Sequence, residues 1–415
     1  MVTGKTKNKR VLLLTYAFPP LQASESFLSV KAFARINSYD IDILTIDSSE
    51  IGYDMDYSLE NYVNENFHNI YKAKTPKWIH KKVFRFLRYV PGFPDRFRFF
   101  NNVIYKKAME IEVPNYDLII SWSTWHSIHL VAYKIKKNFN SIPWVVHLSD
   151  PWADNPFLTK IWGYKASQYF LERKVLKSAD AVNFTTNKSR ILVMKKYPEF
   201  WINKTYVTSH SYDKSLYPKK IGLEPVRDKL IINYLGNFYG PRNPISLVKA
   251  LREIHAKDSN FLNGVVFRFV GKWIGNENWR SILYDIPEDL IEIVSPISYT
   301  DSLIEMSNSD LLLILDAPFK TSVFFPSKLV DYIGAHKPIF AITPKGSCHD
   351  ILQSIGGLHA LPDSTSSISS GVEEAINKLK EGSLISPSFE ETIMYSNNYV
   401  AKQFEILFHQ TINNG

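Results

Sequence analysis

The sequence predicts an α/β protein with two doubly wound domains. Short continuous apolar runs alternate with amphipathic segments along the chain, stop at a basic, proline-containing segment near the middle, and then resume. With 415 residues, the chain is also too long for a single hydrophobic core. We therefore expect one parallel sheet within residues 1–213, a linker at 214–229, a second sheet within 230–388 and a helix within 389–415.

The first predicted domain opens with a basic tail and a buried strand at residues 11–16. The basic start followed by an apolar run superficially resembles a signal peptide. The run is short, however, meets Pro19-Pro20 and has no small-residue cleavage site after it, so a tail and a buried strand are expected instead. Residues 50–69 have no clear period and receive no assignment. Further strands are predicted at residues 41–46, 117–121, 143–148, 181–185 and 205–209, and helices at 26–36, 164–177 and 188–196, with another ending at 138.

A strongly basic segment lies at residues 72–98, which contain nine Lys or Arg residues and a single acid, Asp95. Wound as a helix, the part from Lys77 to Val90 places its apolar side chains in one arc and its basic ones opposite. This pattern favours a peripheral anchor on an anionic membrane surface. The alternative is a solvated helix whose apolar stripe faces the core. No known nucleic-acid-binding motif accompanies the segment, so nucleic acid is not an expected partner.

The second predicted domain repeats the alternation of strands and helices. Strands are predicted at residues 230–235, 265–270, 311–315, 338–342 and 358–361. Helices are predicted at 243–255, 301–307, 348–355 and 369–380, and a last helix at 389–408.

The first strand-to-helix junction of this domain has the composition of a phosphate site. Gly236 and Asn237 open a loop in which glycine permits a close approach of the backbone to a ligand. Arg242 offers a forked donor for a diphosphate, and Pro244 starts a helix.

A second junction, at residues 322–337, also predicts anion binding. Pro326 is suited to a helix start, and Ser327 beside it can cap the free N–H groups there. The positive end of a helix attracts phosphate, and Lys328 adds a full charge in the first turn. Asp331 lies on the same face, where it could accept hydrogen bonds from ribose hydroxyls. The alternative is an ordinary amphipathic helix with a surface ion pair.

Three loops of the first domain follow predicted strands and should converge on one edge of its sheet. They contain Ser24, then Trp125 and His126, and then Asp150 and Trp152. A histidine on such an edge can be catalytic or structural. Asp150 can either bind a ligand or cap the segment that follows it.

Composition and missing motifs exclude several classes of protein. The single cysteine, Cys348, rules out an internal disulfide framework and fits a reducing cytosol. No run of 18 apolar residues predicts a membrane span. The chain has no dinucleotide-binding or Walker A glycine loop, no zincin motif and no cysteine pair for zinc. The net charge of +8 favours an anionic partner.

Four segments resemble those of glycosyltransferase family 4, a retaining group that builds bacterial surface polysaccharides. They are residues 15–20 (TYAFPP), 142–152 (IPWVVHLSDPW), 236–244 (GNFYGPRNP) and 325–332 (FPSKLVDY). They span nearly the full chain in the family's order. The resemblance implies a GT-B architecture, in which two Rossmann-like domains face a central cleft and a C-terminal helix closes back on the N-terminal domain.

The resemblance also implies roles for the residues of the two junctions. Arg242 and Lys328 would contact the donor diphosphate, and Asp331 matches the second acid of the family's E-x7-E signature, which binds the ribose. The first acid is replaced by Val323, and residues 22–24 stand where many members have a glycine pair. The full implied donor set is Gly236, Asn237, Arg242, Ser327, Lys328, Leu329 and Asp331.

On the acceptor side, His126 matches the region where the family often places a histidine near the reacting sugar. The implied catalytic residues are His126 and Asp150, and Ser24, Trp125 and Trp152 are expected on the acceptor side.

The implied activity is retaining transfer of a hexose or related sugar from a nucleotide-diphosphate donor to a hydroxyl of a glycan or lipid-linked acceptor. Capsule, O-antigen or exopolysaccharide synthesis at the cytoplasmic face of the cell membrane is the expected setting. We expect no cofactor and no metal, because two D-x-D sequences at residues 40–42 and 54–56 lie where surface carboxylates are ordinary. The alternatives are a sugar-nucleotide epimerase with the same fold and a catalytically silent GT-B binding scaffold.

Overall fold

The computed structural model describes residues 8–49, 51–76, 94–157, 163–219, 228–274, 282–283 and 286–414. The chain divides into two compact units. Unit 1 comprises Met1–Ser211 and Asn397–Gly415, and unit 2 comprises Tyr212–Ser396. The predicted membrane segment between Lys77 and Val90 lies outside the described residues, so it stays a prediction.

Unit 1 is built on a seven-stranded parallel sheet with the order β3-β2-β1-β4-β5-β6-β7. The chain moves outward from β1 to β3 and then returns to the other side of β1, so the carboxyl ends of β1 and β4 flank a topological switch point. Its strands are β1 (Lys9–Thr15), β2 (Tyr39–Ile46), β3 (Ile70–Ala73), β4 (Leu118–Ser123), β5 (Trp144–Leu148), β6 (Ala181–Phe184) and β7 (Thr205–Val207).

The helices of unit 1 follow these strands in turn. They are α1 (Ser24–Phe33), α2 (Glu60–Asn66), α4 (Asn101–Glu110), α5 (Ser127–Asn138), α6 (Tyr164–Ser178), α7 (Asn187–Met194) and α15 (Asn397–Asn414). Short 3-10 turns lie at η1 (Arg96–Phe100), η2 (Val113–Asn115) and η3 (Glu199–Lys204). The region left unassigned at residues 50–69 contains α2, a seven-residue helix of which only Tyr62 and Val63 are buried. An apolar face of two residues is too short to produce a recognisable helical periodicity in the sequence.

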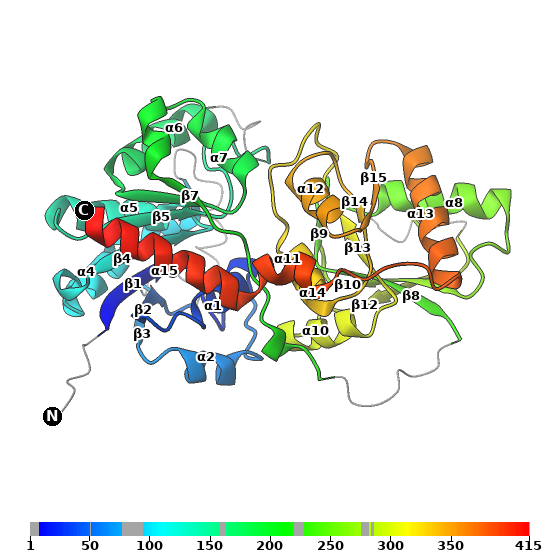
Figure 1. The fold of residues 1–415 in the computed structure, drawn as a ribbon, viewed down its shortest axis with the longest axis horizontal. Coiled ribbons are helices and arrows are strands. Elements are labelled where there is room, and N and C mark those ends of the chain that lie inside the picture. The colour runs from blue at the N-terminus through cyan, green and yellow to red at the C-terminus, as the bar shows by residue number, and fades with distance from the viewer. Residues whose placement is uncertain are drawn as a thin grey trace. The chain divides into compact units, whose positions relative to one another are not determined.

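The C-terminal helix α15 belongs to unit 1, where it lies beside α1 (Figure 1). Phe404 packs against Phe33 and Trp122, with ring centroids 5.1 and 5.9 Å apart. The carboxylate of Glu405 accepts the backbone N–H groups of Asn37 and Ser38 at 3.1 and 3.0 Å. The end of the chain is therefore part of the core of unit 1.

The single helix predicted at residues 389–408 is wrong. The segment is divided into α14 (Phe389–Thr392), the turn η5 (Ile393–Tyr395) and α15. A capping box between Ser388 and Glu391 starts α14, and Ser396 takes an extended conformation that ends η5.

Unit 2 contains a six-stranded parallel sheet with the order β12-β10-β8-β13-β14-β15 and a two-stranded sheet, β11-β9. The strands predicted at residues 230–235, 265–270 and 311–315 are confirmed with these bounds. The strands are β8 (Leu230–Leu235), β9 (Phe238–Tyr239), β10 (Val265–Val270), β11 (Trp273–Ile274), β12 (Ile291–Val294), β13 (Leu311–Leu315), β14 (Ile339–Ile342) and β15 (Leu358–Ala360).

The helices of unit 2 alternate with these strands (Figure 1). They are α8 (Ile245–Lys257), α10 (Tyr299–Ser307), α11 (Ser327–Ala335), α12 (Ser347–Ser354), α13 (Thr365–Lys380) and α14, with a turn at η4 (Lys214–Leu216). Two Rossmann-like parallel sheets, one in each unit, confirm the doubly wound α/β class that the sequence predicts.

Candidate functional site

In unit 2, the glycine loop after β8 meets the first turn of α11 at the ammonium group of Lys328. Gly236 has φ 144°, and a Cβ atom there would lie 2.6 Å from Lys328 Nζ. The positive φ therefore favours glycine, and a Cβ atom there would displace the Lys328 ammonium group. Lys328 Nζ lies 3.7 Å from the ring centroid of Tyr234, a cation–π arrangement that holds the charge at the end of β8.

Arg242 brings a second cation to the same edge of the sheet. Its Nη2 atom forms an ion pair with Asp316 Oδ1 at 2.8 Å, and its Nη1 donates to the hydroxyl of Tyr239. Burial first, and then repulsion by Arg242, hold the pKa of Lys328 well below its usual range, while Asp316 partly opposes this. Lys328 and Arg242 are thus close enough for their charges to repel, and a bound polyanion would stabilise both as cations.

The helix start that carries Lys328 differs from the prediction in its cap. The N-cap residue is Pro326, and no side chain caps α11, so the predicted serine cap is wrong. Ser327 is the first helical residue and is partly exposed, whereas the Leu329 side chain is buried and its N–H donates to Pro326. Asp331 is 6% exposed and accepts a hydrogen bond from Tyr299 at 2.9 Å.

A pocket of about 200 Å³ lies at the carboxyl end of the unit 2 sheet, where Asp316, the partner of Arg242, forms part of its lining. Beside it, Asn243 Oδ1 accepts the N–H of Ile245, the first residue of α8, at 3.1 Å. Asn237 is exposed, and its side chain is used within the fold because it accepts the Lys272 N–H at 2.9 Å. The pocket is lined by Pro241, Asn243, Ile245, Ser246, Leu247, Leu315, Asp316, Pro318, Ile342 and Pro362.

In unit 1, His126 lies at the start of α5 and stacks on Trp152, with centroids 4.9 Å apart and rings 7° from parallel. Burial lowers the pKa of His126 to about 3, so the imidazole is neutral near pH 7. Trp152 was expected on the acceptor side, but it is fully buried and donates to Gln168 at 2.8 Å. It supports His126 from the core and presents no surface to an acceptor.

The other predicted residues of unit 1 are accessible. Ser24 is exposed at the start of α1, and Asp150 is partly exposed just beyond β5. Trp125 is partly exposed and stacks on Phe97, with centroids 3.8 Å apart. Ser24 and Asp150 thus lie on chain segments that follow β1 and β5, at the carboxyl edge of the sheet.

Glu25, which the sequence did not single out, links these segments. Its Oε2 atom lies 2.7 Å from Trp122 Nε1 and 2.8 Å from Ser149 Oγ. Burial first, and then the charge of Asp150, raise the pKa of Glu25 to about 8. The signal in the sequence was slight, since an acid in the first turn of a helix is ordinary.

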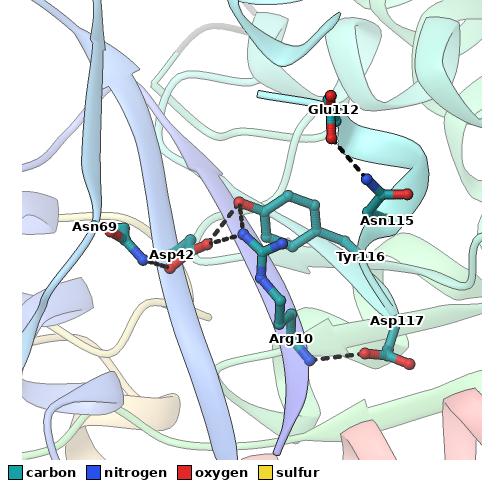
Figure 2. Close-up of polar contacts among 7 residues, drawn as sticks. All are labelled: Arg10, Asp42, Asn69, Glu112, Asn115, Tyr116 and Asp117. Carbon is teal, nitrogen blue, oxygen red and sulfur yellow. Dashed lines mark hydrogen bonds and ion pairs between the residues drawn. The ribbon is translucent and has the colours of Figure 1, made fainter. Parts of the chain in front are cut away.

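The D-x-D sequence at residues 40–42 serves the fold. Figure 2 shows Asp42 between Arg10, Tyr116 and Asn69, at 2.7, 2.6 and 2.8 Å. Among the described residues, no group of three His, Cys, Asp or Glu side chains is arranged to hold a metal ion. Within the same residues, no helix is both long and apolar enough to cross a bilayer.

No protein-family model and no curated protein sequence matches the chain. Solved structures do. Anabaena HepE in complex with UDP and glucose is similar, with a TM-score of 0.69, 12% identity, and coverage of 97% of this chain and 100% of that one. Sucrose-phosphate synthase from Thermosynechococcus elongatus is also similar, with a TM-score of 0.70, 13% identity, and coverage of 98% of this chain and 100% of that one.

A Listeria monocytogenes protein described as a putative UDP-N-acetylglucosamine 2-epimerase is also similar. Its TM-score is 0.57 at 9% identity, with coverage of 96% of this chain and 95% of that one. At these identities the likeness concerns the fold. Together with the two parallel sheets, it shows that the chain has the GT-B fold.

Proposed function

We propose that this protein is a glycosyltransferase that moves a sugar from a nucleotide-diphosphate donor to a hydroxyl of a glycan or lipid-linked acceptor. The observation that carries the proposal is the meeting of Lys328 and Arg242 at the carboxyl edge of unit 2. A diphosphate placed there would relieve the repulsion between the two cations. The fold is shared with HepE, which binds UDP and glucose, and this supports a nucleotide-sugar donor.

The donor site consists of the glycine loop and the first turn of α11. Lys328 and Arg242 stabilise the charge that grows on the leaving diphosphate, so we propose that transfer needs no metal. Gly236 and Asn237 let the backbone approach the phosphates, and Ser327 and Leu329 position the helix start. We propose that Asp331 binds the ribose, as the resemblance to glycosyltransferase family 4 implies. The pocket beside Asp316 is large enough for part of a nucleoside.

The reacting centre in unit 1 contains His126 and Asp150, with Ser24 and Trp125 on the acceptor side. His126 is 7% exposed, neutral and backed by Trp152, so its imidazole is held in one orientation. We propose retention of the anomeric configuration, with the leaving phosphate taking the acceptor proton, because the resemblance to glycosyltransferase family 4 favours it.

The proposed setting is synthesis of a bacterial surface polysaccharide at the cytoplasmic face of the membrane, reached through the basic segment between Lys77 and Val90. Flotation with anionic vesicles tests this part separately. Salt-sensitive binding is the expected result, and no binding at low salt would contradict it.

The test of the activity begins with a thermal-shift screen against UDP, GDP, ADP and CMP sugars. The donor that stabilises the protein is then incubated with a panel of glycoside acceptors, with and without EDTA. We expect transfer in both conditions, with loss of at least a hundredfold in Lys328→Ala and Arg242→Ala. The matched control is Lys257→Ala, whose side chain is 74% exposed near the end of α8.

The second candidate function is a sugar-nucleotide epimerase, favoured by the likeness to the Listeria protein. The same incubation separates the two activities. An epimerase isomerises the donor sugar without an acceptor, whereas a transferase releases the nucleoside diphosphate in proportion to the glycoside formed.

A further inference from the structure

A second pocket of unit 2, of about 320 Å³, lies against the face of the sheet on which α10 packs. Of the described residues, none lines both this pocket and the one beside Asp316. Its volume is at the lower end of the range for ligand pockets, about 300–1,000 Å³, so it suits a small molecule. It is lined by Ile231, Asn233, Arg268, Glu292, Glu305 and Asn308.

The strand register places three of these residues in one polar row across the sheet. Arg268 of β10 is in register with Asn233 of β8 on one side and with Glu292 of β12 on the other. Residues in register on neighbouring strands direct their side chains to the same face. The next residue in the row, Leu312 of β13, is fully buried and apolar. The polar residues are therefore confined to the β12 side of the sheet, where the pocket lies.

Asn233 forms the buried floor of the pocket, and its amide group has no partner. The residue is 1% exposed, and within the described residues neither Nδ2 nor Oδ1 makes a hydrogen bond. An unpaired buried polar group costs free energy, and such groups are rare in folded proteins. A donor and an acceptor left unpaired on one amide therefore favour a molecule in the pocket that supplies both bonds.

Two carboxylates complete the polar wall. Arg268 Nη1 lies 2.6 Å from Glu305 Oε2, and Arg268 Nε lies 3.2 Å from Glu292 Oε2. Both pairs use only Oε2, so among the described residues each Oε1 has no hydrogen bond. The Glu292 side chain is 51% exposed, so the pocket is open to solvent there. With two carboxylates and one guanidinium, the wall has a net negative charge and more acceptors than donors.

We propose that this pocket binds one uncharged monosaccharide unit. Two adjacent sugar hydroxyls fit the Asn233 amide, because a hydroxyl both donates and accepts. One hydroxyl accepts from Nδ2 while its neighbour donates to Oδ1. Further hydroxyls donate to the Oε1 atoms of Glu292 and Glu305. The inference goes beyond the proposed activity, because the sugar is held in unit 2 on residues that belong to neither the donor site nor the reacting centre.

Other classes of ligand satisfy the pocket less completely. An ammonium group or a metal ion offers no acceptor to Asn233 Nδ2. An anionic sugar or a nucleotide would be repelled by the net negative charge of the wall. Ordered water is the remaining alternative, and in that case no sugar binding should depend on Asn233.

The experiment measures binding of methyl glucoside, galactoside and mannoside to the full chain by saturation-transfer NMR, with methyl glucuronide and spermidine as charged comparators. We expect at least one neutral hexoside to bind. Asn233→Leu should weaken that binding about tenfold, because two hydrogen bonds are lost. It should still fold, since leucine has a similar size and removes the unpaired amide. The control Asn260→Leu changes an exposed residue in the turn after α8 and should bind as wild type does.

Thermal unfolding checks the fold of each variant, and Glu292→Ala is the second variant because its side chain is half exposed. It should weaken hexoside binding about threefold. Where Asn233→Leu folds, unchanged hexoside binding by it would overturn the inference; where it does not fold, unchanged binding by Glu292→Ala would do so. Absence of hexoside binding, or preference for the glucuronide or spermidine, would overturn it as well.

UDP binding and sugar transfer are measured with the same variants and report on the proposed function separately. Both should stay within about twofold of the wild type, because the pocket lies outside the donor site. If the wild type neither binds UDP nor transfers sugar while hexoside binding still depends on Asn233, the proposed function fails and the sugar site stands. If transfer proceeds and hexoside binding is independent of Asn233, the sugar site fails and the function stands.

Discussion

The raised pKa of Glu25 predicts a change in stability that needs no substrate. Replacing Glu25 by Gln removes the titration while it keeps the hydrogen bond to Ser149. In the folded protein the carboxyl group ionises at about pH 8, whereas in the unfolded chain it ionises near its ordinary value of 4.5. A raised pKa contributes stability that is complete below pH 4.5 and is lost as pH rises to about 8.

The size of this loss follows from the pKa shift. A change from 4.5 to about 8 corresponds to at most about 5 kcal/mol, at about 1.4 kcal/mol for each unit. The wild type should therefore lose up to about 5 kcal/mol relative to Glu25→Gln as pH rises from 4.5 to about 8, with no further change above.

Urea unfolding of both proteins at pH 5, 6.5, 8 and 9 measures the difference. Every other titrating group is common to the two proteins, so the difference isolates Glu25. Free energies of unfolding that run parallel over this range would refute the raised pKa of Glu25.

Three further predictions concern the two units. UDP binding should be accompanied by proton uptake, because a polyanion raises the depressed pKa of Lys328. Titration calorimetry in buffers of different ionisation enthalpy measures this, and equal uptake in Lys328→Met would contradict it. Gly236→Ala should weaken UDP binding about tenfold and lower stability by about 1–2 kcal/mol, because the new Cβ would lie 2.6 Å from Lys328 Nζ. Unchanged UDP affinity would show that Lys328 does not hold the diphosphate. Asp42→Asn should lower stability by about 2–4 kcal/mol without altering transfer, because Asp42 pairs with Arg10. Loss of transfer in a variant that remains folded would contradict its structural role.

The sequence predicted most accurately those elements whose bounds depend only on their own residues. Strands β8, β10 and β13 are short runs whose side chains are mostly buried, and their bounds follow from the apolar residues alone. The division of the last helix was missed because it depends on one extended residue, Ser396. The sequence also placed Arg242 and Lys328 on strand-to-helix junctions, which the structure brings to one edge of unit 2.

The sequence could not show contacts between residues far apart in the chain. Glu25 is separated from Trp122 and Ser149 by 97 and 124 residues, so its environment exists only after the sheet has formed. Trp152 was placed on the acceptor side because it follows a strand, but its bond to Gln168 of α6 draws it into the core. The hydrogen bond between Asp331 and Tyr299 also joins two different helices, so the sequence could not predict it.

The most direct test of the donor site is transfer of sugar from the stabilising nucleotide sugar by wild type, Lys328→Ala and Lys257→Ala side by side. Glycoside product and released nucleoside diphosphate are quantified together. The proposed site predicts equal amounts of both from the wild type and the Lys257 variant, and at least a hundredfold less from the Lys328 variant. Full activity in the Lys328 variant would contradict it.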